Sequence, residues 1–220
     1  VPSGTNVQNT AVGYDTGTAV TTGTQNTLIG GLAGDAITDA DGNVAVGYAS
    51  LTTATIGSNT AVGSESMQFT TTGANNVAVG FYAAYNLTTG SKNTALGQSA
   101  LEGCTDGTNN VAIGYETGTA DWGDANVAVG YRALKVNTAN NNTAVGYYAL
   151  LQNTTGTNNT AVGLQAGQTQ TTANACTWIG VEAGRDNTAN DNVAIGSGCM
   201  RLNTTGTRNT AVGTGVYGST

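Results

Sequence analysis

The chain has 220 residues, of which 33 are glycine and none is histidine, and it carries a formal net charge of −7 with only 9% charged side chains. The lack of histidine excludes a Ser-His-Asp triad and a histidine metal site. The scattered lysines and arginines exclude a nucleic-acid groove, and no apolar run approaches the ~20 residues of a membrane-spanning helix.

A five-residue motif recurs along the chain at intervals of 16 or 17 residues. It reads Asn, then Thr or Val, then usually Ala, then Val, Ile or Leu, then Gly, and we number the positions of each repeat from its asparagine. A short fixed period of this kind predicts a solenoid, in which each coil contacts only its neighbours. The motif glycines are Gly13, Gly30, Gly47, Gly63, Gly80, Gly97, Gly114, Gly130, Gly146, Gly163, Gly180, Gly196 and Gly213.

Each motif predicts one short β-strand. Five residues rich in Thr and Val and bounded by Asn and Gly favour a strand over a helix. In chain order the strands are expected at residues 9–13, 26–30, 43–47, 59–63, 76–80, 93–97, 110–114, 126–130, 142–146, 159–163, 176–180, 192–196 and 209–213.

The rest of each coil predicts a second strand and a turn. Positions 7 to 12, as in residues 148–153, are expected to form the second strand, and residues 154–158 the turn, where glycine tolerates φ > 0. Equivalent strands then stack in parallel, ~4.8 Å apart. We therefore predict an all-β parallel β-solenoid of about thirteen coils, a single repeat array over residues 1–220 whose half coils at each end allow head-to-tail polymerisation.

Position 1 predicts a ladder of stacked amides. Side-chain amides at this position can hydrogen-bond along the stack, whereas Cys176 interrupts the row and should be a local weak point. The predicted Asn ladder comprises Asn9, Asn26, Asn43, Asn59, Asn76, Asn93, Asn110, Asn126, Asn142, Asn159, Asn192 and Asn209.

The strands are uncharged on both faces, with positions 2 and 4 on one face and positions 3 and 5 on the other. A thin roll has only one interior, so the second face needs a partner, and another copy of the same strand is the simplest one. We therefore expect an obligate oligomer, preferably a trimer. Its assembly ladder is Val12, Ile29, Val46, Val62, Val79, Leu96, Ile113, Val129, Val145, Val162, Ile179, Ile195 and Val212.

The phrases "NTAVG", "NNVAIG" and "DNVAIG" resemble the "NSVAIG" repeats of Yersinia adhesin-like heads in trimeric autotransporter adhesins. The resemblance covers the whole chain. It implies a left-handed β-roll intertwined as a homotrimer, located outside the cell or on its surface, with a host-surface or extracellular-matrix ligand. The longer phrase "NTAVGYYALLQNTTGTNNTAVG" also resembles repeats of phage tail-fibre proteins, which implies a virion location instead.

No catalytic, cofactor-binding or metal site is predicted. Paired carboxylates are the remaining candidates for hydrolysis, but all lie in turns rich in Gly and Asn, where solvated Asp is expected. They are Asp35, Asp39 and Asp41, then Asp121 and Asp124, then Asp186 and Asp191. The segment "DADGN" at residues 39–43 lacks the bidentate Glu of a calcium loop, so a structural turn is favoured.

Two tryptophans are the best single candidates for ligand contact. Trp122 replaces Thr at position 13 and Trp178 replaces Ala at position 3, and both are expected to be exposed because they break their rows. The aromatic residues at position 6 either bind sugars or pack at the strand end, and packing is favoured. These residues are Tyr14, Tyr48, Phe81, Tyr115, Tyr131 and Tyr147.

Two further features leave alternatives open. Position 13 is Thr in all other coils that reach it, and regular Thr arrays on flat solenoids can match an ice surface. Cys104, Cys176 and Cys199 form no disulfide framework or zinc spacing and are expected to be small buried residues, with one Cys176–Cys199 bridge as the alternative.

The sequence therefore predicts a non-enzymatic structural protein, an extracellular fibre or surface adhesin built from trimeric β-rolls. A phage tail-fibre shaft is the first alternative, and an ice- or carbohydrate-binding solenoid is the second. No nucleic-acid partner and no membrane insertion are expected.

Overall fold

The computed structural model describes residues 8–216, which contain thirteen β-strands and no helix. The chain comprises two compact units, residues 1–110 and residues 111–220, built on the same repeat. In the first unit the strands are β1 (Thr10–Val12), β2 (Thr27–Ile29), β3 (Val44–Val46), β4 (Thr60–Val62), β5 (Val77–Val79) and β6 (Thr94–Leu96). In the second unit they are β7 (Val111–Ile113), β8 (Val127–Val129), β9 (Thr143–Val145), β10 (Thr160–Val162), β11 (Thr177–Ile179), β12 (Val193–Ile195) and β13 (Thr210–Val212).

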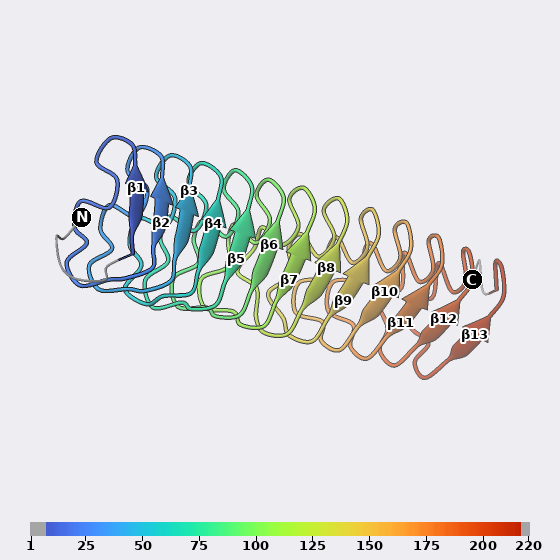
Figure 1. Cartoon of the computed structure of the whole chain (residues 1–220). Coiled ribbons are helices and arrows are strands. Elements are labelled where there is room, and N and C mark those ends of the chain that lie inside the picture. Colours follow the sequence, from blue (N-terminus) through green and yellow to red (C-terminus); the bar gives the residue numbers. More distant parts are fainter. Residues whose placement is uncertain (1–7, 217–220) are drawn as a thin grey trace. The chain divides into compact units, whose positions relative to one another are not determined.

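Within each unit every strand pairs in parallel with the next strand along the chain (Figure 1). The register places each position of one motif beside the same position of the next: Thr143 pairs with Thr160, Ala144 with Ala161. The predicted all-β parallel solenoid is therefore confirmed, with about twelve turns. The described residues contain no apolar helix of membrane-spanning length.

The predicted half coils fall partly on residues 1–7 and 217–220, which lie outside the described residues. End-to-end polymerisation and a single array over the whole chain stay predictions.

The predicted second strand at positions 7 to 12 is wrong, because these residues form a series of turns. Tyr148 and Leu150 have φ of 60° and 48°, in the left-handed region, and a strand cannot contain such residues. Leu151 donates to the Tyr148 carbonyl at 3.3 Å, and Asn153 donates to the Leu150 carbonyl at 3.2 Å. Alternate left-handed residues thus bend the chain round one edge of the coil.

Hydrogen bonds to both neighbouring coils hold these turns in place. Tyr148 donates to the carbonyl of Tyr131 in the coil before it, at 3.1 Å, and Leu150 donates to Ala166 in the coil after it, at 3.0 Å. A left-handed residue costs roughly 1–2 kcal/mol in isolation. The coil-to-coil bonds offset that cost, so residues as bulky as Tyr and Leu are accommodated here.

The glycine at position 5 has a different role, because its φ lies between 127° and 141° in every coil. Side-chain-bearing residues essentially do not adopt this conformation. The backbones also approach closely, so that a Cβ built on Gly146 would overlap the Gly163 carbonyl oxygen. The motif glycine is therefore required both by conformation and by stacking.

The interior of each coil is lined mainly by small side chains. Ala45 and Ala144 at position 3 are fully buried, as are Ala100 and Ala149 at position 8. Leu or Met at position 9, as at Leu150, supplies most of the larger buried groups. The core is consequently thin, and each coil buries little apolar surface compared with a conventional domain.

We predict that Gly146→Ala destabilises the chain by about 3 kcal/mol, because it forces alanine into a glycine-only conformation. Gly198→Ala is the matched control: Gly198 has φ of 64°, open space around it, and its equivalent at position 7 of another coil is Ala49. Denaturant unfolding followed by circular dichroism measures both variants. Equal stability of the two variants would contradict the assigned role of position 5.

Candidate functional surfaces

The outward side of the strands carries the side chains of positions 2 and 4, which we call the strand face. At position 4, Val79, Val162 and Ile179 are 38%, 37% and 39% exposed, whereas Ala78 and Ala161 beside them at position 3 are fully buried. The interior therefore takes the alanine side of the strand. The larger β-branched residues of the assembly ladder lie outside.

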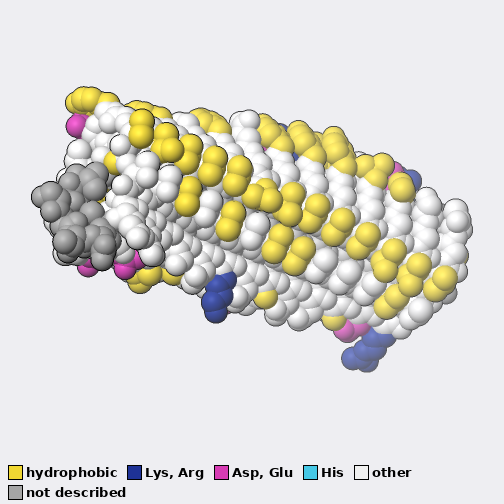
Figure 2. All heavy atoms as spheres, in the orientation of Figure 1, with side chains coloured by type: hydrophobic (Ala, Val, Ile, Leu, Met, Phe, Trp, Pro, Cys, Tyr) yellow, Lys and Arg dark blue, Asp and Glu magenta, His cyan; other side chains and the backbone are white. Residues whose placement is uncertain are grey.

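Charge is excluded from the strand face. All charged residues of the chain occupy position 7, positions 10 to 12 or positions 14 to 17, and none occupies positions 2 to 6. In each unit, Figure 2 shows apolar side chains in stripes over the strands and charged groups at the rims. This surface has the composition of a buried sheet although it faces solvent in the single chain.

The Asn side chains at position 1 hydrogen-bond mainly to backbone groups. The side-chain Oδ1 of Asn59 accepts hydrogen bonds from the main-chain N–H of Asn76 at 3.0 Å and from the Asn76 side-chain amide at 3.2 Å. The Asn76 amide nitrogen also donates to the carbonyl of Gly90, in its own coil, at 2.9 Å. Asn76 thus closes its own coil while Asn59 accepts from the coil that follows it, whereas the side-chain amide of Asn43, in the short third coil, donates to Asn26.

Cys176 replaces only half of this arrangement. Its main-chain N–H still donates to Asn159 at 3.0 Å, and its thiol lies 3.3 Å from the carbonyl of Ala189, the group that an Asn amide would reach. Burial raises the pKa of the Cys176 thiol, which therefore stays protonated as a donor. The main-chain N–H of Asn192 is directed at the Cys176 sulfur, which is a weaker acceptor than the amide oxygen of the other coils.

All three cysteines are buried and unbridged, as small core residues. The alternative of a Cys176–Cys199 bridge is not realised in this structure. The thiol of Cys199 lies 3.4 Å from the carbonyl of Ala211.

A second row of buried amides in the second unit was not predicted. Position 12 is apolar in most of the first unit, as at Ile37 and Leu87, and becomes an amide from the eighth coil onwards. Asn153 donates to Asn137 at 2.7 Å and is fully buried. Its buried members are Asn137, Asn153, Gln170 and Asn187, and Asn203 at the same position of the twelfth coil is half-buried. The change from apolar residues to amides at position 12 was the signal in the sequence that could have predicted this row.

The expectation that Trp122 and Trp178 are exposed is wrong, since they are 1% and 0% exposed. Trp178 lies in the interior between two glycines at position 9 of adjacent coils, and a Cβ on Gly167 or Gly184 would overlap the indole. Its Nε1 donates to Gln170 at 2.8 Å. The large side chain at position 3 thus occupies the interior space that leucine at position 9 fills in other coils.

The same compensation explains other glycines at position 9. Leu28 at position 3 is 1% exposed, and Cβ atoms on Gly17 or Gly34 would press on its methyl groups. In the seventh coil, which is one residue short, Trp122 turns inward and packs against Gly118, with its Nε1 donating to Leu134 at 3.1 Å. The tryptophans fill the core and offer no surface to a ligand.

The tyrosines at position 6 form a stack in the second unit. The ring centroid of Tyr131 lies 5.4 Å from that of Tyr115 and 5.1 Å from that of Tyr147, with the planes within 10° of parallel. The facing surfaces of the rings cover one another. A sugar stacks on an open ring face, so the favoured interpretation of this stack as packing agrees with its geometry.

The threonines at position 13 use their hydroxyl hydrogens within the stack. Thr71 donates to the Thr88 carbonyl at 3.1 Å, and Thr88 donates to the Thr105 carbonyl at 2.9 Å. The same bond joins Thr154 to Thr171 at 3.0 Å in the second unit. Ice binding through this row would have to proceed without these donors.

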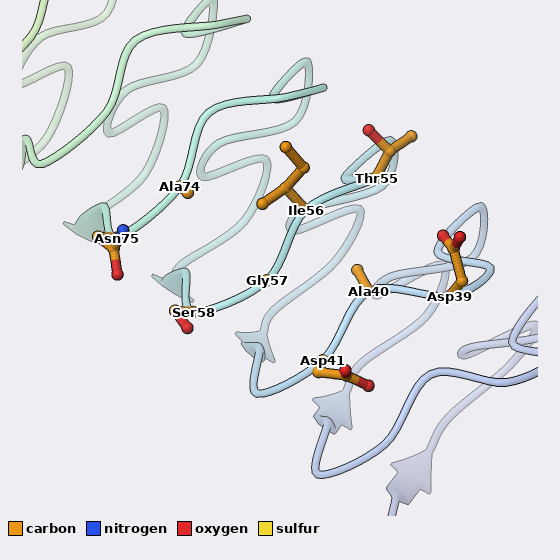
Figure 3. A pocket seen from close by; sticks show the side chains of 9 residues that line it. All are labelled: Asp39, Ala40, Asp41, Thr55, Ile56, Gly57, Ser58, Ala74 and Asn75. Carbon is orange, nitrogen blue, oxygen red and sulfur yellow. The ribbon is translucent and has the colours of Figure 1, made fainter.

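Asp39 and Asp41 border an open depression of about 380 Å³ (Figure 3). It forms beside the third coil, whose outer turn is one residue short. The two carboxylates do not converge, and Asp41 already accepts bonds from Thr24 N and Oγ1 at 2.6 and 2.9 Å. No group of three potential metal ligands occurs among residues 8–216.

Ion pairs occupy one edge of the second unit. Glu116 accepts from Arg132 Nε at 2.8 Å and from Lys135 Nζ at 2.6 Å, and hydrogen bonds, first from Lys135, lower the pKa of Glu116 to about 2. Asp186 pairs with Arg185 at 2.8 Å. Asp186 therefore belongs to an ion pair and does not form a carboxylate pair with Asp191.

Comparison with protein-family models, with curated proteins and with solved structures finds no match for this chain. The resemblance to adhesin heads and tail-fibre repeats therefore stays a prediction, and the surfaces described above carry the functional inference.

We predict that Cys176→Asn stabilises the chain by about 1 kcal/mol, because it gives the Asn192 N–H an amide oxygen in place of a weak sulfur acceptor. Cys199→Ala serves as a control for the loss of a buried thiol without the gain of an amide. Thermal unfolding under reducing conditions measures both. A Cys176→Asn variant with an unchanged or lower midpoint would refute the proposed break in the ladder.

We predict that Trp178→Ala costs about 3–5 kcal/mol through the cavity that it leaves. Adding Gly167→Leu and Gly184→Leu to that variant should recover most of the loss, since the triple variant has the commonest repeat pattern, Ala at position 3 and Leu at position 9. The same two leucines in the presence of Trp178 should destabilise the chain. Unfolding free energies of the four proteins form the cycle, and additive effects would contradict the compensation.

Proposed function

We propose that this chain is a non-enzymatic structural protein that assembles through its strand face into a homotrimeric β-roll, as part of an extracellular fibre or surface adhesin. One observation carries the proposal. The row of Val, Ile and Leu at position 4 is repeated in every coil and lies outside the single chain, with no charged group on the same face.

The energetics favour self-association. Complete burial of one Val or Ile contributes ~1.5–3 kcal/mol relative to full exposure. Five residues of this row are 37–39% exposed, Val12 and Val212 at its ends are 58% and 68% exposed, and the other six are half-buried, so covering each one contributes on the order of 1 kcal/mol or less. Summed over the repeat, this exceeds the cost of association, although single coils contribute little.

The shape of the face favours a closed symmetric assembly. Each strand has only three residues and presents a stripe roughly 10 Å wide. Copies of a narrow stripe can pack against one another around a rotation axis that runs parallel to the stripe. Closed rotational symmetry then leaves no copy of the stripe exposed. The resemblance to trimeric adhesin heads favours three copies and a left-handed roll.

A structural role agrees with how the repeat uses its residues. Positions 1, 3, 5, 8 and 9 serve closure and stacking, and no group of three Cys, Asp or Glu side chains gathers among the described residues. Sequence variation is concentrated at positions 6, 7, 10 to 12 and 14 to 17. A stiff support with variable edges suits a fibre or an adhesin, and a phage tail fibre would need the same architecture.

We predict that the native protein has three times the 21.9 kDa mass of one chain, measured by sedimentation or light scattering. Val145→Glu should dissociate it, because three charges would be brought together at the axis. Thr155→Glu, an exposed substitution in the outer turn of the same coil, is the matched control and should leave the mass unchanged. A folded wild-type monomer would overturn the proposal.

A further inference from the structure

Four aromatic rings form one continuous cluster at the edge of the fourth and fifth coils, which we call the aromatic edge: Phe69, Phe81, Tyr82 and Tyr85. Phe69 meets Tyr85 edge-on, with centroids 5.0 Å apart and planes at 77°. Tyr82 lies 4.7 Å from Tyr85 and stacks on Phe81 at 3.9 Å. The chain has only two phenylalanines, and both are in this cluster, 42% and 44% exposed.

Carboxylates adjoin these rings. Glu65 is hydrogen-bonded to Tyr82, and its negative charge is the main reason that the pKa of Tyr82 is raised, with a smaller effect from Glu102. No ion pair occurs among residues 8–110. The first unit contains seven acidic residues against one basic residue, Lys92, which lies in the outer turn. The aromatic edge therefore combines open ring surface with uncompensated negative charge.

The equivalent edge positions in the second unit show which group a carboxylate and an aromatic ring hold between them. Glu116, at position 7 like Glu65, is paired with Arg132 at position 7 and Lys135 at position 10 of the next coil. The Arg132 guanidinium carbon also lies 5.0 Å from the centroid of the Tyr131 ring. A carboxylate and an aromatic ring together hold a cation there.

In the first unit the two cations of this arrangement are replaced by rings. Tyr82 stands at the position of Arg132, and Tyr85 stands at the position of Lys135, in the coil that follows Glu65. The carboxylate is kept and the aromatic surface is enlarged, but the chain supplies no cation. An external cation would complete the arrangement.

We propose that the aromatic edge, with Glu65 and Glu102, binds an arginine side chain presented by a partner protein. A guanidinium stacks on aromatic faces and pairs with carboxylates through its planar donors, so it uses both components of the edge. The net negative charge of the first unit attracts basic surfaces to this edge. The rings and carboxylates of this edge stand at positions 6, 7, 10 and 11, whereas the strand face consists of positions 2 and 4, so this proposal does not depend on the proposed trimer.

The test uses the native full-length protein and three probes: the peptide acetyl-Arg-Gly-Arg-Gly-Arg-amide, the same peptide with Glu in place of Arg, and the neutral sugar maltohexaose. Titration followed by NMR or tyrosine fluorescence should detect binding of the arginine peptide only, weakening as salt is added. Glu65→Gln and Phe69→Ala should each raise its Kd by about fivefold or more. Tyr14→Ala, an exposed aromatic substitution in the first coil of the same unit, is the control and should leave it unchanged.

A second variant keeps the test independent of folding defects. Tyr82→Arg combined with Tyr85→Lys introduces the cations that the second unit already carries at these positions, so it should fold and fill the edge from within. Binding of the arginine peptide should then be lost with an unchanged circular dichroism spectrum. Absence of peptide binding to the wild type, preference for maltohexaose, or retained binding in this double variant would each overturn the proposal.

Discussion

The hydrogen bonds of the position-1 asparagine are the constraint on which the rest of this structure depends. One amide satisfies a carbonyl at the end of its own coil and a main-chain N–H at the start of the next, as Asn76 and Asn59 do in the first unit. Both groups are buried and would be left unpaired by a side chain without an amide, at a cost of about 1–3 kcal/mol each. Gln is too long to reach both groups, and Asp lacks the side-chain N–H donor, so neither can replace asparagine at position 1. Cys176 is the one departure from the pattern.

A coil closed in this way has room for little else. The backbone fixes a glycine at position 5 and left-handed residues at positions 7 and 9, and the interior accepts mostly alanine. At position 3, a group larger than alanine enters only where position 9 of the adjacent coils is glycine, as Trp178 does between Gly167 and Gly184. The hydrophobic stabilisation that a thin core cannot supply is available on the strand face, and this is why assembly follows from the geometry of the coil.

The two units show how one backbone carries different chemistry. Residues 8–110 are acidic, without ion pairs, and carry aromatic rings at the edge, whereas residues 111–216 carry five basic residues, ion pairs around Glu116 and Glu182, and a second amide row. These differences leave the strand sequences and the position-1 asparagines in place, and the second amide row adds a bond to one of them, from Asn142 to Asn137 at 3.2 Å. The edge positions can therefore change freely, and function in such a repeat is expected to reside there.

The sequence by itself determined the strands, their parallel stacking, the amide row and the uncharged face, because each depends on a residue type that recurs at a fixed period. It failed where the outcome depended on contacts between coils. Left-handed conformations at Tyr148 and Leu150 have no residue signature, since the bonds that stabilise them come from adjacent coils. The burial of Trp122 and the aromatic edge around Tyr82 likewise depend on which positions face each other across coils, and only the tertiary structure decides that.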